Sequence, residues 1–455
     1  MPDETAKVHF DPGHGRAAER RRPGPCKRGN KNRIGDEPHL GRDPGGRRTG
    51  RVPRHPRQQQ PQPVRAAATP AHASGHRGHP AGDRVQGDPI KHVPEHLGPV
   101  FLAGQLRLRS VRTGIEIARA PCHSLRMKIA INGFGRIGRT ILRQVMALPA
   151  GSDVQVVLIN DIAPLETCAY LFQYDSTFGP YAGTVAARDA ALVVDGAEIP
   201  VTNSEDLAQV DLSGVDVLLD CTGIARSSDV AARGLQAGAA KVLISGPSPA
   251  ADTTIVLGAN EDVLGEARIV SNASCTTNAL APLVKVLDGI GGIASGHMTT
   301  IHCYTNSQPM VDAPRGDLAR SRAGALSMVP TTSSATHLID VVLPHLAGRI
   351  SGAAVRVPTA SVSAVDLVAT LETPLDIGEF TTRLRQAVAE SAVLGWTDMP
   401  LVSSDLRARP ESLVIAGPEI RMVGDRQLRV FGWYDNEWGF SARMLDVAGL
   451  MTRAG

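Results

Sequence analysis

Short apolar runs alternate with turns and helical stretches from residue 127 onward. The runs KIAIN (128–132) and VQVVLIN (154–160) are continuous and of strand length, and the stretch 139–148 between them has apolar residues at helical spacing. Strands that are apolar along their whole length are typical of a parallel sheet covered on both faces. Since the alternation continues, we predict a Rossmann-type, doubly wound α/β domain over residues 127–274.

The pattern changes after this domain. Residues 298–305, 351–359 and 426–435 read as longer strands whose faces alternate, which is typical of a mixed or antiparallel sheet. They predict a second, α+β domain over residues 275–440. The last stretch, 441–455, has the spacing of an amphipathic helix, and we expect it to return to the first domain.

Residues 1–126 have a different composition. They hold 24 Lys and Arg against 11 Asp and Glu, a net charge of +13, whereas the rest of the chain has a net charge of −10. They also hold 16 Pro and 16 Gly but only two aromatic residues. Because such a segment cannot bury enough apolar surface to offset chain entropy, we predict a disordered basic extension. Three interpretations stay open: a solvated tail without function, a tail that binds nucleic acid, or a chain whose translation starts at Met127.

Other features of the sequence exclude several classes of protein. The chain begins with neither an apolar signal segment nor an acid-free transit peptide, and it contains no apolar run of the roughly 18 residues that span a bilayer. The 14 histidines and 6 cysteines show neither a CxxC motif nor a regular spacing, so we expect no metal site. Free thiols fit a reducing compartment. These observations predict a cytoplasmic protein without a membrane span.

A glycine-rich turn follows the first predicted strand directly. Gly133, Gly135 and Gly138 form a GxGxxG pattern between strand and helix, and Asp161 follows the next strand. This is the dinucleotide-binding fingerprint, whose glycines allow a tight turn, close approach of a pyrophosphate, and contact between helix and sheet. Because a carboxylate at position 161 accepts hydrogen bonds from ribose hydroxyls and repels a 2′-phosphate, we expect NAD rather than NADP. The alternative is a structural turn with a surface aspartate.

Cys275 lies in the octet SNASCTTN, between an apolar strand and a predicted helix. A thiol at a helix N-terminus faces unpaired N–H groups and the positive end of the helix dipole, which favours the thiolate. The flanking hydroxyls and amides are suited to cap the helix or to bind an anion. His302 is a candidate partner of this thiolate, although a strand histidine is also common in a core. We expect Cys303, the next residue, to point to the opposite face and to pack there.

Arg356 is the third unusual residue, because it lies in an otherwise apolar strand. An arginine there needs an anion, and both a structural carboxylate and a substrate phosphate are open possibilities. Thr305 and the hydroxyls of residues 331–334 either add phosphate donors or form a polar turn. Cys221 and Thr222 close another predicted strand of the first domain, where ligands bind such sheets, and we interpret Cys221 as core or as a wall of the cofactor site.

Several segments resemble the phosphorylating glyceraldehyde-3-phosphate dehydrogenase family. They are NGFGRIGR, the Asn160-Asp161 pair, YDSTFG, SNASCTTN, the HxYTN segment, RVPT with SVSAVDL, and WYDNEWGFSARMLD. The resemblance runs in order from Met127 to about Leu450. It implies a Rossmann fold, NAD as cofactor, a phosphorylated aldehyde and inorganic phosphate as substrates, and a homotetramer in which the irregular segment 306–330 lines a neighbouring subunit's cofactor pocket.

The resemblance also implies a role for each candidate residue. Cys275 would attack the aldehyde as a thiolate, and His302 would lower the pKa of the thiol, bind the oxyanion and take the hydroxyl proton. Asn436 would hold the carboxamide of the nicotinamide. The positions that match the family's cofactor site are Gly133, Gly135, Arg136, Ile137, Gly138, Asp161, Thr222 and Asn436. Thr305 and Arg356 match the site for the substrate phosphate, and Ser274, Thr276 and Ser333 match the site for the attacking phosphate.

The chain departs from the family pattern at a few positions. Where the family has Thr-Gly at the end of the phosphate loop, this chain has Ser333-Ser334, and a glycine lets backbone N–H groups approach a phosphate. Ala313 replaces a leucine near the adenosine ribose, which bears on the choice between NAD and NADP. The alternatives that stay open are the sister enzyme erythrose-4-phosphate dehydrogenase, a reductive enzyme of the aspartate-semialdehyde type, and a non-catalytic protein that binds partners through its basic tail.

Overall fold

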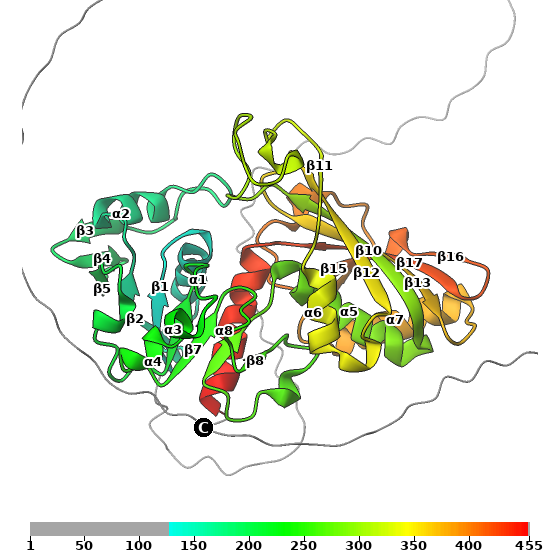
Figure 1. Cartoon of the computed structure of the whole chain (residues 1–455), viewed down its shortest axis with the longest axis horizontal. Coiled ribbons are helices and arrows are strands. Elements are labelled where there is room, and N and C mark those ends of the chain that lie inside the picture. Colours follow the sequence, from blue (N-terminus) through cyan, green and yellow to red (C-terminus); the bar gives the residue numbers. More distant parts are fainter. Residues whose placement is uncertain (1–126, 454–455) are drawn as a thin grey trace, which may run out of the picture. The chain divides into compact units, whose positions relative to one another are not determined.

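The computed structural model describes residues 127–453, which all fall in one compact unit of the chain (Figure 1). The predictions for residues 1–126, namely disorder, possible nucleic-acid binding and the alternative start, lie outside the described residues. None of the helices between residues 127 and 453 is long and apolar enough to span a bilayer.

The first part of the described chain forms a nine-stranded sheet in the order β3-β4-β5-β2-β1-β6-β7-β9-β8. Its strands pair in parallel from β5 to β8, and β3, β4 and β5 form an antiparallel extension at one edge. The elements are β1 (Met127–Asn132), α1 (Arg136–Met146), β2 (Val154–Asn160), α2 (Leu165–Gln173), β3 (Val185–Arg188), β4 (Ala191–Val194), β5 (Ala197–Thr202), β6 (Val217–Asp220), α3 (Ser228–Ala231), α4 (Arg233–Gln236), β7 (Lys241–Ile244), β8 (Thr253–Thr254) and β9 (Ile269–Ser271).

Apolar side chains pack on both faces of this sheet. On one face, Ile129 and Ile131 of β1 join a buried cluster with residues of α1 and of α8 (Trp438–Arg453), among them Met444. On the other face, Ala130 of β1 joins a cluster that includes Ala231 of α3. The sheet is therefore covered on both sides, and the Rossmann-type α/β class predicted from the apolar strands is confirmed.

The second part forms an eight-stranded mixed sheet in the order β11-β12-β10-β13-β17-β15-β14, with β16 paired to β17. Strand β10 pairs in parallel with β12 and antiparallel with β13. The elements are α5 (Cys275–Gly291), β10 (Ile293–Cys303), β11 (Val329–Thr331), α6 (Ala335–Val342), β12 (Ile350–Val357), β13 (Ser363–Leu371), α7 (Ile377–Glu390), β14 (Leu394–Thr397), β15 (Leu413–Ala416), β16 (Arg421–Val423), β17 (Gln427–Tyr434) and α8. Residues of α5, α6 and α7 form one buried cluster with those of β10, β13 and β17.

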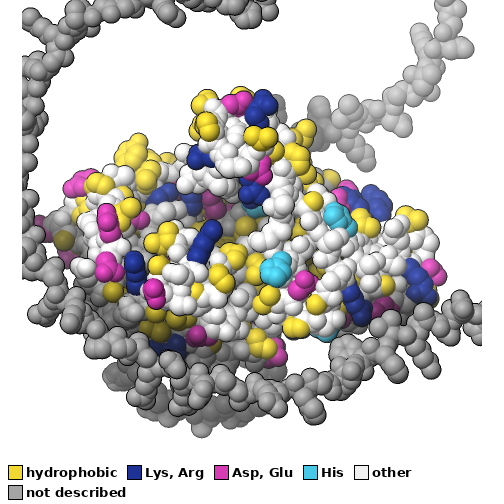
Figure 2. Space-filling view, in the orientation of Figure 1, with side chains coloured by type: hydrophobic (Ala, Val, Ile, Leu, Met, Phe, Trp, Pro, Cys, Tyr) yellow, Lys and Arg dark blue, Asp and Glu magenta, His cyan; other side chains and the backbone are white. Residues whose placement is uncertain are grey.

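The segment between β10 and β11 is irregular and carries exposed apolar side chains. Met310, Leu318 and Leu326 are 77%, 89% and 82% exposed. In Figure 2, hydrophobic and charged side chains lie together at the top of the molecule, over the loops that lead into β11. Large apolar side chains in such number on an ordered loop indicate an interaction surface.

Candidate active site

Cys275 is the first residue of α5, directly after the carboxyl edge of the parallel sheet. Between β9 and the helix, Ala273 is fully buried and has a φ of 54°, a left-handed conformation that costs a non-glycine residue free energy. Ser274 then caps α5, because its side chain accepts a hydrogen bond from the N–H of Thr277 at 3.1 Å. The strained turn and the cap thus place the thiol at the helix N-terminus, where the sequence predicted it.

The structure brings His302 to this thiol. Nε2 of His302, near the end of β10, lies 3.8 Å from Sγ of Cys275. The imidazole is 5% exposed, and its other nitrogen, Nδ1, lies 2.7 Å from the carbonyl oxygen of Cys303. A nucleophile and a base at this separation match the geometry of covalent catalysis, in which such contacts tighten when substrate binds.

Asn436 is the third side chain at the sulfur. It lies in the turn after β17, with Nδ2 3.2 Å from Nε2 of His302 and 3.8 Å from Sγ of Cys275. Its Oδ1 accepts hydrogen bonds from the hydroxyl of Ser363 at 2.8 Å and from the thiol of Cys303 at 3.3 Å. The amide therefore contacts the Cys–His pair itself.

Ser363 was not predicted as part of this arrangement, and Cys303 makes a contact here that the sequence did not predict. The hydroxyl of Ser363 accepts a hydrogen bond from the N–H of Cys303 at 3.0 Å and donates one to Oδ1 of Asn436. It therefore links β10 and β13 to the amide of Asn436. Its predecessor Val362 has a φ of 66°, unusual for a β-branched residue. Cys303 is buried, as expected, and its thiol in addition donates to Oδ1 of Asn436.

Arg356 lies beside His302 because the two residues are register partners on the parallel strands β10 and β12. Nη1 of Arg356 is 2.6 Å from Nδ1 of His302 and 3.2 Å from the carbonyl oxygen of Cys303. Neither of these two partners of Arg356 is a carboxylate. Of the two alternatives raised by the sequence, a structural carboxylate and a substrate anion, these contacts favour the second.

The electrostatics of this site differ from the prediction for the thiol. Burial is the main effect that raises the pKa of Cys275, while the amide of Asn436, the charge of Arg356 and hydrogen bonds from Thr276 oppose it. The pKa of His302 is lowered to about 4, first by burial and then by the charge of Arg356, although the carbonyl of Cys303 raises it. Burial therefore acts against the thiolate that the helix N-terminus was expected to favour.

The glycine turn has the geometry that a dinucleotide requires. Gly133 has a φ of 89°, and a Cβ there would lie 2.9 Å from backbone atoms of Cys221. A Cβ on Gly138 would lie 2.3 Å from the carbonyl oxygen of Gly133, whereas one on Gly135 would meet nothing within 4 Å. Gly133 and Gly138 therefore close the turn, while the space at Gly135 fits a pyrophosphate at the start of α1.

Comparison with known proteins decides the family. Residues 127–228 match the model of the glyceraldehyde 3-phosphate dehydrogenase NAD binding domain, and residues 274–436 match the model of the C-terminal domain of the same enzyme. The glyceraldehyde-3-phosphate dehydrogenase of Xanthobacter flavus is 44% identical over 335 residues, which cover 72% of this chain and 99% of the relative. That of Pseudomonas aeruginosa is 46% identical over 325 residues, 71% of this chain and 97% of the relative.

The chain belongs to the glyceraldehyde-3-phosphate dehydrogenase family. Its cofactor is NAD, as the glycine turn predicted. Asp161 binds the turn directly, with Oδ2 accepting from the N–H of Phe134 at 2.5 Å and Oδ1 from that of Ala163 at 2.8 Å. Across the sheet edge, the hydroxyl of Thr222 donates to the buried carboxylate of Asp220 at 2.6 Å, which fixes the strand end that faces Gly133.

Arg136 and Ile137, the other two predicted cofactor residues, use their side chains within the protein. Ile137 packs against the apolar cluster of the first sheet. The guanidinium of Arg136 forms ion pairs with Asp175 and with Glu437, the residue after Asn436. Because both side chains are occupied, only the backbone N–H groups of Arg136 and Ile137, at the N-terminus of α1, are available to a cofactor.

The predicted phosphate ligands lie on different elements and differ in how free their hydroxyls are. Thr276 is the least available, because it is buried and its Oγ1 bonds to the hydroxyl of Tyr434 at 2.8 Å. Thr305 bonds to the hydroxyl of Ser307 at 2.9 Å, on the exposed side. Ser333 accepts the N–H of Ala335 at 3.2 Å, at the start of α6.

The exchange of glycine for Ser334 does not strain the phosphate loop. Ser334 has a φ of −77° and a ψ of −9°, which any residue adopts readily. Arg320 was not assigned from the sequence, yet its Nη2 donates to Oγ1 of Thr332 at 3.0 Å, next to Ser333. A guanidinium beside these hydroxyls adds a cationic donor to the phosphate loop.

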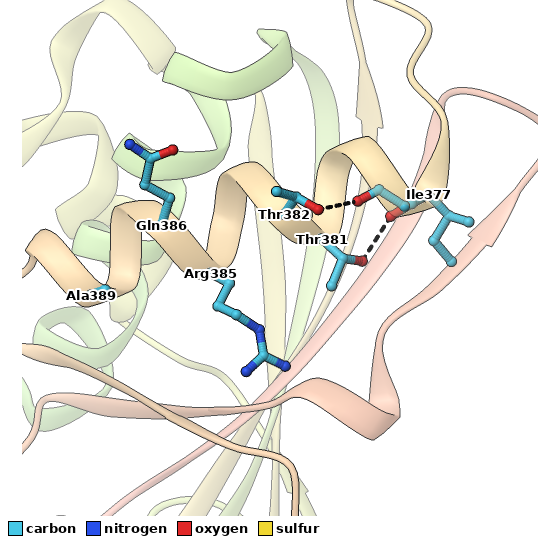
Figure 3. Close-up of a pocket in the computed structure, with 7 residues that line it drawn as sticks. Ile377, Thr381, Thr382, Arg385, Gln386 and Ala389 are labelled. Carbon is cyan, nitrogen blue, oxygen red and sulfur yellow. Dashed lines mark hydrogen bonds between the residues drawn. The ribbon is translucent and has the colours of Figure 1, made fainter.

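A surface hollow of about 560 Å³ lies elsewhere, along the exposed face of α7 (Figure 3). The hydroxyls of Thr381 and Thr382 that line it donate to carbonyl oxygens of their own helix, and Arg385 is paired with Asp398. Its polar groups are thus satisfied locally. Among residues 127–453, no group of three or more side chains is arranged to hold a metal ion.

Proposed function

We propose that this protein oxidises glyceraldehyde 3-phosphate with NAD and inorganic phosphate to 1,3-bisphosphoglycerate, and that Cys275 carries the acyl group. The observation that supports this most directly is the 3.8 Å contact between Sγ of Cys275 and Nε2 of His302 at the start of α5. Family membership supports the substrates, because the relatives carry the name glyceraldehyde-3-phosphate dehydrogenase.

In the first step, the sulfur of Cys275 attacks the aldehyde carbon and forms a thiohemiacetal. His302 takes the proton of the thiol beforehand, hydrogen-bonds the oxygen that becomes negative, and then gives this proton to it to form the hydroxyl. Thr305 and Arg356 hold the phosphate of the substrate, so the carbonyl carbon is fixed at the sulfur. A guanidinium and a hydroxyl are donors that together suit a phosphate monoester.

In the second step, the thiohemiacetal loses its hydroxyl proton to His302 and becomes a thioester on Cys275. The bound NAD supplies the acceptor for the hydride that this oxidation releases. Inorganic phosphate, held by Ser274, Ser333 and Arg320, then attacks the thioester carbon. The carbon–sulfur bond breaks, the acyl phosphate leaves, and the sulfur returns to its starting state.

A coupled activity assay tests this proposal. The purified full-length protein should reduce NAD with glyceraldehyde 3-phosphate only when phosphate or arsenate is present. Cys275→Ser should abolish the reaction, whereas Cys168→Ala, a change of a buried free thiol in the first sheet's cluster, should retain it. Activity without phosphate, or a higher kcat/KM with erythrose 4-phosphate, would contradict the proposal.

We also propose that the protein acts in the cytoplasm as a homotetramer whose segment 306–330 covers a neighbouring copy. Leu318 and Leu326 support this, because large apolar side chains are rarely so exposed in an isolated subunit. Light scattering on the purified protein should give four times the subunit mass, and Leu318→Glu should lower it. A monomeric wild type at micromolar concentration would refute the assembly but not the chemistry.

A further inference from the structure

The amide of Asn436 has different neighbours at its two ends. Its Nδ2 lies 3.2 Å from Nε2 of His302 and 3.8 Å from Sγ of Cys275. Its Oδ1 lies 2.8 Å from the hydroxyl of Ser363 and 3.3 Å from Sγ of Cys303. Because Asn436 is buried, these neighbours decide how the amide is oriented.

The hydroxyl of Ser363 fixes the direction of the hydrogen bond to this amide. It accepts a hydrogen bond from the backbone N–H of Cys303 at 3.0 Å, so its own proton is free for Oδ1 of Asn436. The thiol of Cys303 donates to the same oxygen. A carbonyl oxygen has two lone pairs, and both are therefore occupied. The amide is held with its NH2 group on the side of Cys275.

The opposite orientation of the amide would leave buried groups without partners. Its NH2 group would then face the hydroxyl of Ser363 and the thiol of Cys303, and both of these would lose the acceptor for their proton. Both side chains are buried, so water does not readily replace the lost acceptor. The hydroxyl of Ser363 therefore selects between two orientations of the amide that are nearly equal in shape.

The mixed sheet places Ser363 where three strands end. Ser363 is the first residue of β13 and is paired with Tyr434, the last residue of β17. Strand β10 pairs with the other edge of β13 and ends at Cys303. Val362, just before Ser363, has a φ of 66°, a conformation that a β-branched residue keeps only where its surroundings hold it. The backbone thus fixes the position of the hydroxyl.

The orientation of this amide matters for the cofactor. The proposed oxidation requires the nicotinamide ring to contact the carbon bound to Sγ of Cys275, and Nδ2 of Asn436 lies 3.8 Å from that sulfur. A nicotinamide carboxamide could offer either its carbonyl oxygen or its NH2 group to Asn436. Since both lone pairs of Oδ1 are used, only the NH2 group of Asn436 is left to bind it.

We infer that Ser363 is a positioning residue for NAD: with the thiol of Cys303, its hydroxyl keeps the NH2 group of Asn436 turned toward the nicotinamide, whose carbonyl oxygen is the group recognised. The inference rests on the proposed function, because that reaction is what brings the nicotinamide to Cys275. Ser363 acts only through the amide of Asn436.

Calorimetric binding to the full-length protein, freed of nucleotide and without aldehyde, tests this inference. Ser363→Ala should weaken the binding of NAD about tenfold, the loss expected for one hydrogen bond, because the amide no longer has a preferred orientation. The binding of ADP-ribose, which lacks the nicotinamide, should not change, whereas a general loss of structure would weaken both ligands. Ser351→Ala removes an exposed hydroxyl of β12 that bonds to His297, and this matched control should bind both ligands as the wild type does.

Cys303 provides a second pair of variants. Cys303→Ala removes the weaker donor to Oδ1 and should weaken the binding of NAD about threefold. Cys303→Ser keeps a donor at this position and should retain the affinity of the wild type. Again, the affinity for ADP-ribose should stay the same in both variants.

Two analogues of NAD decide the matter in the wild type, even if Ser363→Ala does not fold. The 3-acetylpyridine analogue keeps the carbonyl oxygen but has no NH2 group, and it should bind within about threefold of NAD. The 3-aminopyridine analogue keeps an NH2 group but has no carbonyl oxygen, and it should bind about tenfold more weakly than NAD.

The inference would be overturned if the wild type preferred the aminopyridine analogue, or if Ser363→Ala bound NAD as well as the wild type or lost NAD and ADP-ribose equally. A protein that reduces NAD with glyceraldehyde 3-phosphate but shows one of these results refutes the role of Ser363 alone. One that shows the expected binding but does not reduce NAD refutes the proposed function alone.

Discussion

Arg136 and Glu437 form a bidentate ion pair, in which Nε binds Oε1 at 2.9 Å and Nη2 binds Oε2. The arginine begins α1 directly after the glycine turn, and the glutamate follows Asn436. The pair therefore connects the glycine turn of the NAD-binding domain with the amide beside the sulfur of Cys275. This ion pair is therefore a candidate for keeping the groups that bind the two ends of one cofactor at a fixed separation.

The first prediction concerns this ion pair. Glu437→Gln should raise the KM for NAD several-fold and lower kcat, because Arg136 loses one charged partner and the turn that carries Asn436 loses its link to α1. For a pair that is partly exposed, we expect a loss of about 1 kcal/mol in the free energy of unfolding. Steady-state kinetics and denaturant unfolding measure both. Glu379→Gln breaks an exposed pair with Arg383 on α7 and should change neither kinetic constant; an equal effect there would argue against a specific role.

The second prediction separates the glycines of the turn. Gly138→Ala should destabilise the protein strongly, because its Cβ would meet the carbonyl oxygen of Gly133 at 2.3 Å, and backbone cannot yield as a flexible side chain does. Gly135→Ala should leave the thermal midpoint of the cofactor-free protein nearly unchanged, since its Cβ meets nothing within 4 Å. It should instead weaken NAD binding, measured by calorimetry. Similar thermal losses in both variants would contradict this division.

The third prediction concerns pH. The pKa of His302 is about 4 in the folded protein and 6.5 ordinarily, so the unfolded chain binds the proton first as the pH falls. The free energy of unfolding should therefore decrease from about pH 6.5 to about pH 4, by up to about 3 kcal/mol from this group. Denaturant unfolding at several pH values measures the slope. His302→Gln should remove this part of it, and an unchanged slope would show that His302 is not the group responsible.

The fourth prediction concerns the phosphate loop. Ser334→Gly should leave the KM for phosphate unchanged, because Ser334 already has an ordinary backbone conformation at φ −77°. It should lower the free energy of unfolding by about 0.5 kcal/mol, since glycine loses more entropy on folding. Initial rates over a range of phosphate concentrations test the first part. A marked fall in KM would mean that the serine side chain itself obstructs the anion.

Much of the fold and part of the site could be predicted from the sequence. Buried parallel strands are apolar throughout, and a glycine turn with φ of 89° at Gly133 has a local signature. Cys275 was identified as a thiol at a helix start because its strand, cap and helix are consecutive in the chain. These predictions succeeded where the physics is local. The antiparallel strands β3 to β5 were not predicted.

The missing parts depend on contacts between distant segments. In the sequence, Ser363 looks like an ordinary serine of a strand. Its role in holding the amide of Asn436 follows only from its contacts with Cys303 and Asn436 in the folded protein. The position of Arg356 follows from the register of β10 on β12, which a sequence pattern does not fix. Burial of Cys275 among these distant segments raises the pKa of its thiol, whereas Arg356 on β12 lowers it.

Strand β10 lies between β12 and β13 and is hydrogen-bonded to both along most of its length. A slip of one residue against either neighbour would turn His302 away from the sulfur and move it off Arg356. His302 thus cannot loosen by fraying of a loop; it is released only when a central strand opens. We expect the backbone amides of β10 to exchange with deuterium among the slowest in the protein, so that loss of activity on heating coincides with global unfolding and does not precede it.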